Sequence, residues 1–157
     1  METVNAIKIT YMNTTCIVST PDGDTDPFSI ITGVLQGDPL APFLFIICLD
    51  YAMRLSVLDT DGLVLKRRRS RRHPQQQLTD LDFADDIALF EETIRSAQNL
   101  LNRVEIACQS VGLFLNPSKT KYMKINSDDS TPITTSDGSV LEQVSDFKYL
   151  GGLNKHC

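Results

Sequence analysis

The amino-acid sequence predicts a single α+β domain, in which an antiparallel sheet is backed on one face by two helices. Two segments place apolar residues at helical spacing, and several short runs rich in strand formers are bounded by turn-forming residues. The chain has 157 residues, of which 41% are hydrophobic, so it is long enough for one core. This composition excludes a disordered or collagen-like chain.

The first elements are predicted to form a β-hairpin followed by a helix. Strands are expected at residues 16–20 and 28–32, because residues 21–24 between them (Pro-Asp-Gly-Asp) are turn formers. Asp38 can then accept hydrogen bonds from the first amides of a helix, and Pro39 suits a first helical position that needs no donor. The helix should run from about residue 39 to about residue 58.

The longest apolar run, residues 40–49, is interpreted as part of a buried core helix. Asp50 stops this run well short of the roughly 20 residues that a bilayer span requires. Residues 1–10 contain Glu2 and Lys8 and show neither an apolar stretch nor a cleavage site of the secretory kind. We therefore expect an intracellular chain, nuclear or cytoplasmic, that neither enters a membrane nor is secreted.

The second half should supply the rest of the sheet and the second helix. Residues 66–77 are expected to be a flexible basic loop, followed by short strands at 81–84 and 87–90. Apolar residues at helical spacing predict an amphipathic helix over residues 93–111, which Gly112 ends in a left-handed conformation. A strand at about 121–125 and a strand-like tail at 147–152 complete the prediction.

The formal charge of −5 conceals an uneven distribution. Residues 66–72 contribute 6 of the 15 basic side chains, which leaves 9 positive and 20 negative side chains elsewhere, a net charge of −11. Nucleic-acid-binding proteins generally have a basic surface, so only this segment fits that class. The four cysteines are far apart and form no CxxC pair, which favours reduced packing residues over disulfides or zinc ligands.

Asp85 and Asp86 are the residues most suited to chemistry. Adjacent carboxylates between apolar strands are costly unless water or a cation meets their charge, and both can approach one site only at a tight turn. Hard divalent ions prefer carboxylate and phosphate oxygens, and a pair of such ions can stabilise the attacking and leaving oxygens of nucleotidyl transfer. A solvated turn is the alternative interpretation of this dipeptide.

Four short sequence motifs, which occur in a fixed order along the chain, favour a metal-binding site over a solvated turn at residues 85–86. They are Gly-Val-Leu-Gln-Gly-Asp-Pro-Leu at 33–40, Phe-Ala-Asp-Asp at 83–86, Gly-Leu-Phe-Leu-Asn-Pro-Ser-Lys-Thr-Lys at 112–121, and Phe-Lys-Tyr-Leu-Gly-Gly at 147–152. Together they resemble the reverse transcriptases of non-LTR, LINE-type retrotransposons. The resemblance implies part of a polymerase palm over residues 1–157, acting as an RNA-directed DNA polymerase on an RNA template, a DNA primer and deoxynucleoside triphosphates.

The resemblance also implies roles for individual residues. Asp85 and Asp86 would be the catalytic, metal-binding pair, holding two Mg²⁺ ions in the intact enzyme, with Mn²⁺ as a substitute. Gln36, Gly37 and Phe83 would contact the incoming nucleotide and the template, and Gly37 lets backbone approach a ligand closely.

Lys119 would lie near the triphosphate, where its charge could balance developing phosphate charge. An exposed turn lysine is its alternative interpretation, and Lys121 is an alternative occupant of the role. The tail resembles the primer grip, a hairpin that holds the primer end, and would use Phe147, Tyr149, Leu150, Gly151 and Gly152. An edge hairpin that packs Phe147 and Leu150 into the core is compatible with that role.

The basic run admits three interpretations. Arg67, Arg68, Arg69, Arg71 and Arg72 could neutralise nucleic-acid phosphates, form a solvated variable loop, or serve as a nuclear localisation signal.

The resemblance implies further parts that the sequence does not show. Related polymerases use another aspartate, on a strand several dozen residues before Gln36, and Glu2 is the only carboxylate ahead of Tyr11. The fingers and thumb are not recognisable either, so we expect no polymerase activity from this chain alone. A catalytically dead remnant or a nucleic-acid-binding module is the alternative function. A third hypothesis is another palm-fold nucleotidyl transferase such as a cyclase. The residues at 36–39 and 149–152 disfavour this hypothesis.

Overall fold

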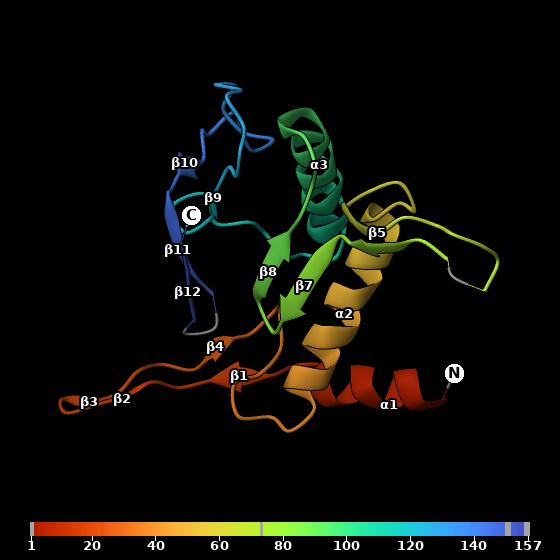
Figure 1. The fold of residues 1–157 in the computed structure, drawn as a ribbon. Coiled ribbons are helices and arrows are strands. Elements are labelled where there is room, and N and C mark those ends of the chain that lie inside the picture. The colour runs from red at the N-terminus through yellow and green to blue at the C-terminus, as the bar shows by residue number, and fades with distance from the viewer. Residues whose placement is uncertain (1, 73, 150–151, 156–157) are drawn as a thin grey trace. The chain divides into compact units, whose positions relative to one another are not determined.

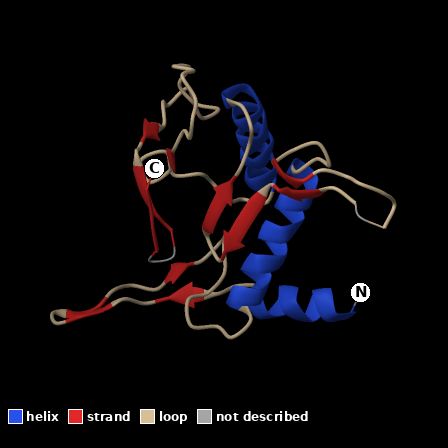
Figure 2. Cartoon of the chain, viewed as in Figure 1, coloured by secondary structure: helices blue, strands red, loops and turns tan. Residues whose placement is uncertain are grey.

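The computed structural model describes residues 2–72, 74–149 and 152–155, and its mixture of helices and short strands confirms the predicted α+β class (Figures 1 and 2). The chain divides into two compact units, Met1–Ile47 and Cys48–Cys157. Among the described residues, no helix is both long and apolar enough to cross a bilayer.

The first unit begins with helix α1 (Glu2–Tyr11), which the sequence analysis did not predict. The helix buries none of its side chains, and Val4 and Ile9 are both about 70% exposed. Because no apolar stripe is buried, the periodicity that reveals most helices is missing. Asn13, with a φ of 57°, ends the segment in the left-handed region that asparagine tolerates.

The predicted N-terminal hairpin is present with different bounds. The strand predicted at 28–32 is limited to residues 28–29, and residues 23–24, which were predicted as part of the turn, form a strand. Strand β1 (Thr15–Cys16) pairs with β4 (Phe28–Ser29), and β2 (Ser19–Thr20) pairs with β3 (Gly23–Asp24), all antiparallel. Between the two ladders Thr25 bonds Val18 twice, through its backbone N and its side chain. The hairpin therefore continues across the gap through a side chain rather than a regular strand.

Helix α2 (Ala41–Ser56) follows and is two residues shorter at each end than predicted. It buries Leu49, Ala52 and Met53 but leaves Phe43 and Ile47 more than 60% exposed. The interpretation of residues 40–49 as a buried core helix was therefore wrong for most of that run. The helix is apolar around its circumference, so its composition could not show which side is covered.

The second unit contains β5 (Leu63–Lys66), β6 (Gln76–Leu78), β7 (Asp80–Phe83), β8 (Asp86–Leu89), β9 (Lys121–Tyr122), β10 (Glu142–Gln143), β11 (Asp146–Tyr149) and β12 (Gly152–Lys155). These strands form separate ladders, β5–β6, β7–β8, β9–β10 and β11–β12, of which β9–β10 is parallel. The prediction of one antiparallel sheet was wrong in this respect for the described residues.

Two predicted boundaries also differ. Lys66 and Gln76 pair with each other at the end of the β5–β6 ladder, so the unpaired part of the predicted loop 66–77 is shorter. The strand predicted at 121–125 is limited to β9, and the backbone bends at residues 125–126.

Helix α3 (Ile94–Ser110) organises the core of the second unit and confirms the helix predicted at 93–111. The Thr93 side chain accepts a hydrogen bond from Ser96 N at its start, and Gly112 follows its end with a φ of 79°. Its apolar face meets a small cluster made of Leu101, Ile133, Leu141, Leu89 and Tyr122. Leu89 comes from β8, so α3 supports the β7–β8 hairpin.

Two polar side chains of α3 hold the segment at residues 134–136. The Gln98 amide donates to Thr134 O at 2.6 Å and accepts from Thr134 N at 2.8 Å, as a neighbouring strand would. The buried Glu105 carboxylate accepts from Ser136 N at 2.8 Å and from Ser136 Oγ at 2.7 Å. The helix thus supplies hydrogen-bond partners to this backbone segment, and Ser136 in return satisfies the buried Glu105 carboxylate.

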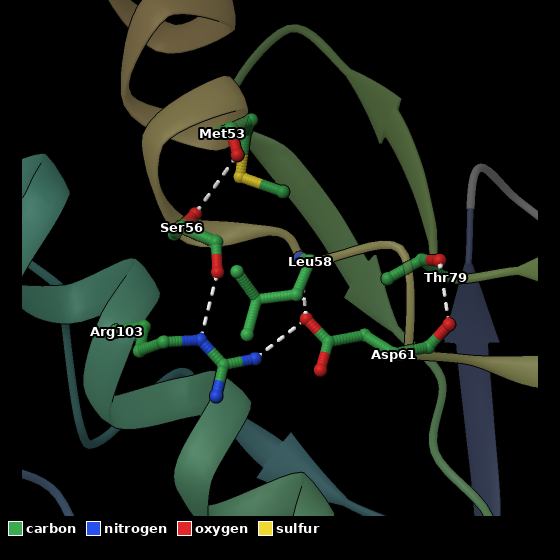
Figure 3. A network of polar contacts seen from close by, with 6 residues as sticks. All are labelled: Met53, Ser56, Leu58, Asp61, Thr79 and Arg103. Atoms are coloured by element: carbon green, nitrogen blue, oxygen red, sulfur yellow. Dashed lines mark hydrogen bonds and ion pairs between the residues drawn. The ribbon is translucent and has the colours of Figure 1, made fainter.

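A second polar network joins the end of α2 to α3 and to the start of β5 (Figure 3). Arg103 donates to Ser56 O at 2.8 Å and forms a 2.5 Å ion pair with Asp61. Asp61 also accepts from Leu58 N, and its carbonyl accepts from Thr79 Oγ1. At Gly62 a Cβ would lie 2.6 Å from Leu78 O, so the backbones of β5 and β6 meet only because this residue is glycine.

Candidate active site

The β7–β8 hairpin carries the two adjacent aspartates at its tip. Phe83 and Asp86 are the last cross-strand partners, so Ala84 and Asp85 form a two-residue turn (Figure 1). Ala84 has a φ of 55°, in the left-handed region where hairpin turns favour glycine or asparagine. An alanine there costs about 1–2 kcal/mol, and such strain concentrates at functional sites.

Asp85 and Asp86 are both exposed at this tip. Cross-strand partners point to the same side of a ladder, so Asp86 shares a face with Phe83, whose side chain is 62% exposed. Among the described residues, no group of three or more His, Cys, Asp or Glu side chains converges on a point where a metal could bind. Two carboxylates nevertheless fit Mg²⁺, which is usually bound by one or two carboxylates together with waters and substrate phosphates.

The opposite face of the hairpin carries two further carboxylates that the sequence analysis missed. Asp80 and Asp82 pair across the ladder with Leu89 and Ile87, and Leu89 packs against the α3 cluster. Burial raises the pKa of Asp82, and the charges of Asp80 and Asp50 raise it further. The available signal was the Asp-x-Asp spacing, which places both residues on one side of a strand.

Lys119 lies in the turn that follows Asn116. Its amide donates to Asn116 O at 3.1 Å, while Ser118 N donates to the Asn116 side chain. The Lys119 side chain is exposed and makes no ion pair within the described part of the chain. Lys121, the alternative occupant of the same role, is instead paired with Glu142 across β9 and β10.

Gln36 and Gly37 form the centre of a turn in the first unit, in which Asp38 N donates to Leu35 O. Gly37 has a φ of 91°, as the third position of such a turn requires, and nothing lies within 4 Å of the place where a Cβ would be. Asp38 accepts hydrogen bonds from the Tyr11 hydroxyl and from Leu40 N, and these bonds lower its pKa. The turn is thus fixed by α1 while its outer side remains open.

The segment predicted as a primer grip forms the β11–β12 hairpin. Phe147 pairs with Asn154 and Tyr149 with Gly152. Phe147 is half-buried, whereas Leu150 and Gly151 lie outside the described residues.

The structure thus brings Phe83, Asp85 and Asp86 together on one hairpin tip. Lys119 and the β11–β12 hairpin belong to the same unit as this tip, and Gln36 and Gly37 belong to the other. The five arginines of the basic run lie between β5 and β6 and are all exposed.

Comparison with protein families matches residues 1–152 to the family described as reverse transcriptase (RNA-dependent DNA polymerase). This match includes every residue assigned above to the candidate site.

Curated relatives agree. The Retrovirus-related Pol polyprotein from type-1 retrotransposable element R2 of Nasonia vitripennis is 32% identical over 130 residues, covering 76% of this chain and 12% of the relative. Its counterpart in Popillia japonica is 30% identical over 136 residues, which cover 81% of this chain and 21% of the relative. The polyprotein from type-2 retrotransposable element R2DM of Drosophila melanogaster is 27% identical, covering 94% and 14%. The chain therefore spans between 12% and 21% of the length of these relatives.

Proposed function

Because this chain belongs to the reverse transcriptase (RNA-dependent DNA polymerase) family, as part of the reverse transcriptase domain of a non-LTR retrotransposon, we propose that its β7–β8 hairpin is the carboxylate centre of an RNA-directed DNA polymerase. The observation that carries this proposal is the strained two-residue turn that exposes Asp85 and Asp86 side by side. Backbone strain of this kind clusters at functional sites, which supports a functional role for the tip that carries the two carboxylates.

The reaction joins a deoxynucleotide to a primer. The primer 3′ oxygen forms a bond to the α-phosphorus of a deoxynucleoside triphosphate, the bond to the pyrophosphate leaving group breaks, and the hydroxyl proton passes to solvent or base. Asp85 and Asp86 would hold two Mg²⁺ ions, for which Mn²⁺ could substitute, and these ions supply charge neutralisation at the attacking and leaving oxygens.

Other residues would position the substrates. Gln36 and Gly37 would contact the nucleotide and template through the open side of their turn, and Phe83 would do so from the face it shares with Asp86. Lys119 would balance the triphosphate charge. This role is supported by the lack of an ion pair at its side chain among the described residues and by the pairing of Lys121 with Glu142. The β11–β12 hairpin would hold the primer end, with an RNA strand as template.

The test is Mg²⁺- or Mn²⁺-dependent primer extension on an RNA template. This chain and a form extended upstream are each compared with their Asp85→Asn variants. Asp22→Asn, in the exposed turn of the β2–β3 hairpin, is the matched control for loss of one carboxylate. We expect extension in the longer form, a loss of at least about a hundredfold with Asp85→Asn, and little change with Asp22→Asn.

Two results would contradict the proposal. Full extension by the Asp85→Asn variant would remove Asp85 from the site, and no extension by the longer form with either metal would favour a catalytically dead remnant.

A further inference from the structure

The loop that joins β5 to β6 presents an unusual set of cations. It carries five exposed arginines within six residues: Arg67, Arg68, Arg69, Arg71 and Arg72. Within the described part of the chain, none of the five guanidinium groups has an ion pair or a hydrogen-bond partner. Like charges at this spacing repel one another, so the loop is electrostatically unsatisfied on its own.

The lack of partners is not caused by a shortage of carboxylates. Outside residues 66–72 the chain has 20 acidic and 9 basic side chains. Three of those basic residues do form ion pairs: Arg54 with Asp50, Arg103 with Asp61, and Lys121 with Glu142. Because no described carboxylate pairs with the arginines at 67–72, this cluster is available for an external polyanion.

Both ends of the loop are anchored. Leu63 pairs with Leu78 and Lys66 with Gln76, while Gly62 packs against the Leu78 carbonyl. The Arg103–Asp61 ion pair fixes the start of β5 to α3 (Figure 3). The arginines therefore extend beyond a ladder that is tied to the core of the second unit (Figure 1).

We propose that residues 67–72 are a contact site for the phosphate backbone of nucleic acid, without base specificity. The planar guanidinium fork matches two phosphate oxygens at once, better than an ammonium does. Arginine and Ser70 are the only residues in this span, so it contains no aromatic side chain to stack on bases and no amide to bind base edges. The assignment rests on the function proposed above, which supplies template and primer as the polyanions.

A receptor groove for basic peptides is the competing partner. Such grooves bind extended segments, whereas this run turns at Arg71 and Arg72 and is held at both ends by paired strands. The loop geometry therefore favours a phosphate backbone, which can be contacted from any direction.

The experiment is fluorescence anisotropy with a labelled single-stranded RNA and a DNA of the same sequence, each also scrambled, over a range of KCl concentrations. The Arg67→Gln/Arg68→Gln/Arg69→Gln variant is compared with a control of equal net charge, Lys8→Gln/Arg54→Gln/Arg95→Gln, in which three exposed cations outside the loop are removed. A variant with all five arginines replaced by lysine separates guanidinium geometry from charge. Circular dichroism confirms that each variant is folded.

We expect the loop variant to bind RNA at least about tenfold more weakly, with its slope of log K against log salt reduced by about 2, since each phosphate contact on a single strand contributes about 0.7. The control variant should change less than about threefold, the lysine variant should lie between, and scrambling should have no effect.

Three results would overturn the inference: no binding by the unaltered chain at low salt, equal losses in the loop and control variants, or displacement of RNA by polyglutamate as effective as by unlabelled RNA. If the longer form with Asp85→Asn keeps full extension activity while the loop variant loses binding, the polymerase assignment fails and the phosphate site stands. If the loop variant keeps its binding while Asp85→Asn abolishes extension, the reverse holds.

Discussion

Ala84 is the residue on which the geometry of the aspartate turn depends, because it adopts the left-handed conformation that an L side chain resists. Replacing it with glycine should stabilise the chain by about 0.5–1 kcal/mol, the relief of strain being partly offset by the greater freedom of glycine in the unfolded chain. Urea denaturation measures the difference. Ala88→Gly, in the regular part of β8, is the control and should destabilise by a similar amount. Effects of the same sign at the two positions would contradict strain at Ala84.

Asp82 is expected to weaken the fold at neutral pH. Its pKa is raised by burial and by Asp80 and Asp50, so between its unfolded and folded pKa the native state binds more protons than the unfolded state, and stability rises as the pH falls through that window. Asp82→Asn should therefore raise the melting temperature at pH 7.5, and the gain should shrink as the pH is lowered through the folded pKa. Thermal denaturation at a series of pH values tests this. A gain that is constant with pH would mean that charge is not the cause.

At the scale of elements, Arg103 is the residue that joins α2, α3 and the start of β5. Arg103→Ala should destabilise the chain by about 2–3 kcal/mol, because it leaves the nearly buried Asp61 carboxylate without its counter-charge. Arg54→Ala removes an exposed pair with Asp50 on one helix and should cost less than about 0.5 kcal/mol. Urea denaturation of the two variants gives the comparison. Equal losses would mean that the Figure 3 network contributes no more than a surface pair.

The elements that the sequence revealed are those with a strong local signal. Apolar periodicity and Gly112 located α3, and turn formers located the hairpin around residues 21–24. The missed helix α1 buries no side chain, so it leaves no periodic trace. The pairing of β9 with β10 joins segments about twenty residues apart in parallel, and nothing in either two-residue strand indicates its partner.

The residues of the candidate site likewise differ in how strong a local signal they leave in the sequence. Asp85 and Asp86 were found because adjacent carboxylates between apolar strands are chemically costly and lie within a recognisable string. Asp82 was missed because its raised pKa arises from partial desolvation and from the charges of Asp80 and Asp50, which spacing alone does not show. The pairing of Lys121 with Glu142, twenty-one residues further along the chain, could not be predicted from the sequence, and the role of Lys119 stays a prediction.

At the scale of the whole molecule, several carboxylates couple stability to acid. Hydrogen bonds from Thr135 and Ser139 lower the pKa of Asp137, and the pKa values of Asp38 and Asp129 are lowered in the same way. The unfolded state then binds more protons, so the stabilisation is present above the ordinary pKa of 3.8 and is lost as the pH falls through the lowered folded pKa. Asp137→Asn should flatten this acid limb in a denaturation series. An acid limb identical to that of the unaltered chain would show that Asp137 does not contribute to it.

The hydrogen bonds between α3 and residues 134–136 affect the tendency of the chain to aggregate at high concentration. An extended segment with unsatisfied amides and carbonyls is a template for pairing with another molecule, and many proteins suppress such aggregation with charges, prolines or bulges. Here the Gln98 amide occupies the Thr134 edge and the Glu105 carboxylate occupies Ser136 N, so a second chain finds these groups already engaged. Two side chains on a helix thus perform the capping that an additional strand would otherwise provide, and this edge is closed to intermolecular β-pairing.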